Sequence, residues 1–188
     1  MGTPSDHGPS KELKNRSTPI KEGIPVRNAG IVLLNDYIIM LFERLNLLED
    51  RHFISVDHQK KAVQYLQYVV TGISETEEAY LPLNKVLCGL SLTDNVPDAI
   101  EISPEDRSLI EGLINAAISY WSVIGDSSID GFRGNWLVRD GILTEFDEKW
   151  ELTVEKRAYD MLINKSPFAF SIIKYPWMNK PLHVIWPF

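Results

Sequence analysis

The most reactive side chains in this 188-residue chain are one cysteine and four histidines. Cys88 lies in the stretch VLCGL, where a helix is expected to end in a turn. A nucleophilic thiol at this position would need a neighbouring base and a positive environment that stabilises the thiolate. The adjacent residues supply neither, so Cys88 is expected to pack as a small apolar side chain.

Metal ligands and the common catalytic motifs are missing from the sequence. The histidines are scattered along the chain, at His7, His52, His58 and His183, without the spacing of a metal site. The acidic cluster of Glu75, Glu77 and Glu78 is expected to be a solvated loop. There is no GxSxG, no phosphate-binding glycine loop and no HExxH. The sequence therefore predicts a non-enzymatic protein with no catalytic residue, metal or cofactor.

Aromatic side chains near the C-terminus are the best candidates for contact with a protein partner. Two prolines bracket a loop that carries Trp177 and Met178, residue types that are enriched at interfaces. Trp177 can equally fold back and cover the core. Trp186 and Phe188 lie at the end of the sequence, where the chain either pairs into a sheet and packs or binds a partner.

The elements that position these side chains follow from the hydrophobic pattern. Residues 28–50 form the longest apolar run and are expected to make one long central helix. Its continuous apolar arc consists of Leu34, Tyr37, Ile38, Leu41, Phe42, Leu45 and Leu48. Ile39, Met40 and Leu47 lie on the mixed face of this helix. They are expected either to be covered by a second neighbour or to form a partner-binding surface.

Capping residues and turn signals place the remaining elements: Ser55 or Asp57 can cap one helix, and Ser103 can cap another. Further helices are expected over residues 56–72, 82–89, 104–124, 128–139 and 155–164. Residues 93–102 have no period and are expected to be a loop. Two runs at 142–146 and 150–154 predict a hairpin, and strands are expected at 168–174 and 182–186.

The predicted fold is α+β, with one helix-rich domain over residues 26–188 and a small antiparallel sheet in its C-terminal part. Residues 1–25 are rich in proline and glycine and carry few large apolar side chains. Such a segment buries too little surface to offset its ordering entropy. It is therefore expected to be a disordered arm, either a passive tether or a segment that orders on a partner.

Charge argues against nucleic acid and membrane as partners. The net charge is −7 and the isoelectric point about 5.1, whereas phosphate binding needs clustered lysine and arginine. The sequence has no secretion signal, no apolar stretch long enough to span a membrane and only one cysteine, which together predict a cytoplasmic protein.

Two alternative functions stay open. Two helices followed by a hairpin over residues 110–154 is the order of a winged helix, a nucleic-acid-binding or regulatory module. Its expected recognition helix offers only Arg133 and Arg139, so charge disfavours this alternative. The other is an enzyme whose active site is assembled from residues far apart in the sequence.

Five blocks of the sequence resemble a known family when taken in order. They are VRNAGIVLLNDYIIMLFERLNLLED, LNKVLCGLSL, SSIDGFRGNWLVRDGIL, WELTVEKRAYDML and IIKYPWMNKPLHVIW. Together they span residues 26–186 and resemble the contractile injection system tape measure proteins of bacterial phage-tail-like machines, in which a sheath contracts around an inner tube.

The resemblance implies a structural or assembly role inside a contractile particle, with no catalytic residue to transfer. It implies partners among the inner tube, the baseplate and the sheath terminator or cap, and a homo-oligomer by the symmetry of the machine. A folded core of this size is only about 30 Å across. Unless the chain is one part of a longer ruler, it is expected to bind or cap one end of the tube.

Overall fold

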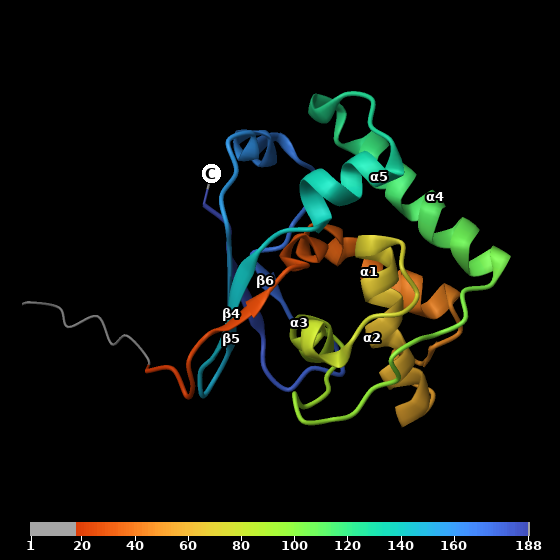
Figure 1. Ribbon diagram of the computed structural model, residues 1–188, viewed down its shortest axis with the longest axis vertical. Coiled ribbons are helices and arrows are strands. Elements are labelled where there is room, and N and C mark those ends of the chain that lie inside the picture. Colours follow the sequence, from red (N-terminus) through yellow and green to blue (C-terminus); the bar gives the residue numbers. More distant parts are fainter. Residues whose placement is uncertain (1–17, 188) are drawn as a thin grey trace, which may run out of the picture.

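The computed structural model describes residues 18–187 and shows a helical body packed on one side of a five-stranded sheet (Figure 1). The α-helices are α1 (Asn35–Arg44), α2 (Val56–Thr71), α3 (Pro82–Leu87), α4 (Pro104–Tyr120) and α5 (Ile129–Phe132). The 3-10 helices are η1 (Ala29–Leu34), η2 (Glu78–Tyr80), η3 (Ser122–Ile124) and η5 (Asp160–Lys165), and η4 (Arg133–Leu137) is a π-helical turn. The α+β class is confirmed.

The main sheet has the strand order β1-β4-β5-β7-β6. Its strands are β1 (Ile24–Val26), β4 (Gly141–Glu145), β5 (Trp150–Val154), β6 (Ile172–Ile173) and β7 (Leu182–Ile185). The predicted hairpin is confirmed as β4 and β5, which pair antiparallel from Gly141↔Val154 to Glu145↔Trp150. The sheet as a whole is mixed, not antiparallel as predicted, because β7 joins β5 in parallel.

The prediction of one long helix over residues 28–50 is wrong. The run divides into η1, α1 and the short strand β2 (Leu48–Glu49), which pairs with β3 (His52–Phe53). Every residue of η1 is buried. Gly30 lies so close to the backbone of Trp136 that there is no room for a side chain at this position. At the other end, α1 gives way to Asn46 with a positive φ of 58°. Contacts with neighbouring elements, and not the 3.6-residue spacing of the apolar side chains, therefore set the local structure of this run.

The helices with strong local caps form as predicted. The Ser55 and Ser103 side chains accept hydrogen bonds from the backbone N–H groups of His58 and Asp106 at the starts of α2 and α4. Gly72 ends α2 with φ 72°, which is the left-handed C-cap that glycine adopts without strain. Residues 93–102 form the predicted loop.

The C-terminal third contains less regular structure than predicted. Residues 155–159 are irregular, and the predicted helix there is reduced to the 3-10 turn η5. The expected strand over residues 168–174 is confined to β6. Residues 24 and 25, assigned to the arm, belong to β1, and the Ile20 backbone N–H donates to the Glu145 carbonyl at 2.9 Å. Residues 18–23 of the predicted arm are described and lead into β1, whereas residues 1–17 lie outside the described residues.

One continuous apolar core joins the inner face of the sheet to the helices. Leu143 and Leu152 point from the sheet into this core, and Phe42 of α1 and Trp121 at the end of α4 are fully buried in it. None of the helices within residues 18–187 combines the length and the apolar character needed to cross a bilayer.

Candidate functional site

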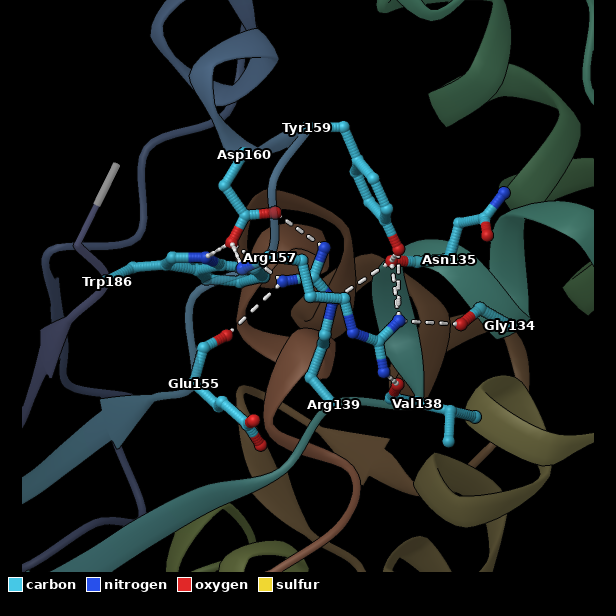
Figure 2. Close-up of polar contacts among 9 residues, drawn as sticks. All are labelled: Gly134, Asn135, Val138, Arg139, Glu155, Arg157, Tyr159, Asp160 and Trp186. Carbon is cyan, nitrogen blue, oxygen red and sulfur yellow. Dashed lines mark hydrogen bonds and ion pairs between the residues drawn. The ribbon is translucent and has the colours of Figure 1, made fainter.

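The most densely bonded polar cluster surrounds Arg139, which follows η4, and Asp160, which begins η5 (Figure 2). The two side chains form a bidentate ion pair with N–O distances of 2.8 and 2.7 Å, and both are fully buried. The Asp160 carboxylate also accepts from the Trp186 indole N–H and from the Arg157 backbone N–H, each at 2.9 Å. Four donors therefore hold this carboxylate.

The Arg139 guanidinium is enclosed by aromatic rings as well as by oxygen acceptors. It lies 5.2 Å from the ring centroids of Trp136, Tyr159 and Trp186, which is cation–π distance. Its Nε donates to the Asn135 carbonyl at 2.9 Å. Rings contributed by η4, by the segment before η5 and by the end of β7 are thus gathered around one buried charge.

Electrostatics in the cluster favour the ionised carboxylate. Burial by itself raises the pKa of Asp160, but the hydrogen bonds from Arg139, the Arg157 backbone and Trp186 outweigh it and leave the pKa below its usual range. The Asp160 carboxylate therefore stays ionised at neutral pH.

A second arginine completes the cluster from the solvent side. The Arg157 guanidinium donates to the carbonyls of Gly134 at 3.1 Å and Val138 at 3.0 Å, and to the Tyr159 hydroxyl at 3.1 Å (Figure 2). These carbonyls belong to η4 and the residue after it, where a helical segment leaves acceptors without intrahelical donors. Arg157 therefore fixes η4 to the chain that leaves β5.

A separate network of amides lies beneath η1. The Asn28 side-chain amide donates to the Asn84 oxygen at 2.6 Å and to the Gln67 oxygen at 2.9 Å. Asn84 in turn donates to the Val63 carbonyl at 3.0 Å. All three amide side chains are buried, so the network fixes η1 to α2 and α3.

These arrangements hold the chain together and do not resemble reaction centres. The carboxylate that a general acid or base would need is saturated by donors. Among residues 18–187 no group of three or more histidine, cysteine or acidic side chains is placed to hold a metal ion. Cys88 is fully buried, and burial raises its pKa, as expected for a packing residue and not for a nucleophile.

The acidic stretch and the proposed recognition helix also have structural partners. Glu78 forms an ion pair of 2.8 Å with the buried Lys85, so it is not a free solvated acid. Arg133 donates to the carbonyls of Val69 and Tyr68 at the end of α2. Because Arg133 and Arg139 both point into the protein, a winged-helix arrangement has no exposed arginine from this segment for phosphate contact.

The predicted partner-binding residues differ in how deeply they are buried. Leu47, Met178 and Trp186 are 3%, 4% and 5% exposed, so their assignment to a partner surface is corrected: they are core residues. Trp177 is half-buried among Phe42, Phe53 and Tyr175, and its N–H donates to the Leu87 carbonyl at 2.8 Å. It folds back over the core, which was the alternative prediction. Ile39 is half-buried, Met40 is 37% exposed, and Phe188 lies outside the described residues.

The sequence pattern placed Arg139 only in a possible recognition helix and singled out neither Arg157 nor Asp160 as part of a site. No motif marks them, because a surface charge and a buried charge look the same in a sequence. The only signal was the concentration of all five tryptophans in residues 121–186, which pointed to this region without naming the charges between the rings.

Comparison with protein families gives one match. A family model described as contractile injection system tape measure protein matches residues 3–186. Comparison with curated proteins and with solved structures finds no match for this chain.

Proposed function

The chain belongs to the contractile injection system tape measure protein family, and we propose that it acts in such a machine as an end-binding assembly domain, not as the extended rod that sets tube length. Family membership over nearly the whole chain supports a structural or assembly role. That match is the observation on which the proposal depends.

Shape favours an end-binding domain over a rod. A ruler must extend in proportion to the tube that it measures. The longest helix among the described residues is α4, with 17 residues, which is about 25 Å long at 1.5 Å per residue. A domain of this size is about 30 Å across. The described part can therefore mark one position in a tube but cannot span a long one.

Internal bonding also suits a domain that keeps its shape under load. The C-terminal strand is held by the Trp186 contact to Asp160, and the loop before it by the Trp177 contact to Leu87. The first strand is held by its pairing with β4. Both ends of the described chain are thus anchored in one sheet, so the surface that it presents is preformed.

The proposed partners are the inner tube, the baseplate and the sheath terminator or cap. Binding at one of these would nucleate or close the tube, and a symmetric machine would display several copies. The second candidate from the sequence, a nucleic-acid module, is not favoured by the inward direction of Arg133 and Arg139.

Deletion followed by particle imaging tests the assembly role. The expected result is a loss of particles, or particles with open or detached ends, rescued by the full chain. Normal particles at normal yield would contradict the proposal.

A separate insertion distinguishes an end-binding domain from a ruler. Twenty helix-forming residues inserted after the exposed Asp126 add about 30 Å if the chain lies in series along the tube. An end-binding domain predicts an unchanged tube length. Tubes lengthened in proportion to the insert would show a ruler instead.

A further inference from the structure

The helices α1 to α5 lie on one side of the main sheet, and the described residues leave its other face open (Figure 1). A row of side chains crosses this open face on four paired strands: Pro25, Ile142, Thr153 and Ile185. All four are exposed, Ile142 by 44% and Ile185 by 46%. The next row holds Ile172 of β6, 60% exposed, beside the polar residues His183, Glu151 and Thr144. The row of Pro25, Ile142 and Ile185, interrupted by Thr153, gives the open face a largely apolar stripe across the strands.

Charged side chains border this stripe at one end. Arg27 directly follows β1, Asp140 directly precedes β4 and Glu155 directly follows β5. With Pro25, Ile142 and Thr153 they line a groove of about 440 Å³. Within residues 18–187, neither carboxylate has a cationic group within 4.0 Å, whereas Arg27 lies over the Tyr80 ring at 5.3 Å. The groove therefore has an apolar floor, and its rim carries Arg27 and two carboxylates that have no ion-pair partner among residues 18–187.

The dimensions of the face decide what can cover it. Five strands about 4.8 Å apart and up to about 17 Å long give an area of roughly 350 Å². A stable interface between folded proteins buries about 800 Å² on each partner. The face alone is small beside an interface of that kind, which favours a narrow partner segment over a stacked second copy. An area of this size fits one helix or one extended segment.

A partner is not expected to bind by adding a strand to either edge of the main sheet. Binding to the open face is the remaining mode. The edge strand β1 has Pro25 at its centre, which has no N–H to donate to a further strand. The opposite edge strand, β6, has only two residues.

We infer that the open face, defined by Ile142, Ile185 and the acidic rim of Asp140 and Glu155, binds a single segment of a partner protein that carries an apolar stripe next to a lysine or arginine. The apolar stripe would cover the isoleucines, and the basic residue would pair with the rim. This inference rests on the proposed function, because it takes the partner to be a protein of the same machine.

Photocrosslinking from the full chain tests where the partner lies. A benzoyl-phenylalanine is placed at position 142 or 185, with position 54 as the control, because Ile54 is similarly exposed at 48% but lies beside β3, outside the main sheet. Crosslinks from 142 and 185 to one segment of a tube, baseplate or cap protein are expected, with none from 54. Crosslinks to a second copy of the chain, or equal labelling from 54, would overturn the inference.

Peptide binding tests the chemistry of the segment. The probe is a set of overlapping 20-residue peptides from the tube, baseplate and cap proteins of the machine. The bound peptide is expected to be basic, and its affinity to fall at least tenfold in Ile142→Thr/Ile185→Thr, which keeps strand-forming residues. Asp140→Asn/Glu155→Gln is expected to remove most of the salt dependence. A preference for acidic peptides, or affinity unchanged in both variants, would overturn the inference.

The two proposals fail in different ways. If deletion leaves particles normal, the assembly role is wrong. If deletion abolishes particles but the folded Ile142→Thr/Ile185→Thr chain restores them fully, the assembly role stands and this face is not the binding site. Circular dichroism and the thermal midpoint confirm that the variant is folded.

Discussion

Arg139 and Asp160 are 21 residues apart in the sequence and form a bidentate ion pair from which water is excluded. The pair lies among three aromatic rings and binds the indole of Trp186. It therefore joins η4, η5 and the end of β7 at one point, which makes it the most sensitive place to test the architecture.

Removal of the carboxylate is expected to destabilise the protein strongly. Asp160→Ala leaves the Arg139 charge buried without its partner, which costs about 3–5 kcal/mol of unfolding free energy. Urea denaturation measures the loss. Asp130→Ala is the matched control, because Asp130 lies 3.8 Å from Arg133 with its side chain 97% exposed and should change stability little. Equal effects of the two substitutions would contradict the role of burial.

The same pair predicts how stability depends on pH. Because the native pKa of Asp160 lies below its unfolded value of about 3.9, its contribution is complete above that value and is lost as the pH falls through the native pKa. The difference in unfolding free energy between the native sequence and Asp160→Asn should be constant near neutrality and should shrink below about pH 4. A difference that stays constant to pH 3 would refute this assignment.

Two glycines with different surroundings are expected to respond in opposite ways to substitution by alanine. Gly30 lies where η1 closely approaches η4, and Gly112 lies in open space. A Cβ on Gly30 would lie 1.7 Å from the Trp136 carbonyl oxygen, so Gly30→Ala must displace backbone and should cost about 3 kcal/mol or more. Gly112 in α4 has open space around it, and Gly112→Ala should raise stability by about 0.5–1 kcal/mol. Thermal unfolding of both variants checks the pair, and similar shifts in the same direction would argue against this packing.

Burial of Cys88 predicts an unreactive thiol. Desolvation raises its pKa and the side chain has no exposed surface, so a disulfide reagent at pH 8 should leave the native protein unmodified for hours. The thiol should react fully once urea unfolds the chain. Rapid modification of the native protein would show that the segment around α3 opens easily.

The sequence by itself determined the features that depend on neighbouring residues. The caps at Ser55 and Ser103 and the hairpin of β4 and β5 formed where local chemistry placed them, because a cap or a short turn is satisfied within a few residues. The order of five sequence blocks identified the family, and the family match over residues 3–186 confirms it.

Only the tertiary structure decided the features that depend on distant partners. The apolar run of residues 28–50 became η1, α1 and β2: Gly30 lies against the backbone of Trp136, more than 100 residues away, and Leu48 pairs with Phe53. Trp186 became a core residue, not a free end, because its N–H donates to Asp160. The open row of Ile142 and Ile185 exists only because β4 pairs with β5 and β5 with β7 in register. Periodicity reports which side chains are apolar, but the contacts that bury one and expose another are made across the whole chain.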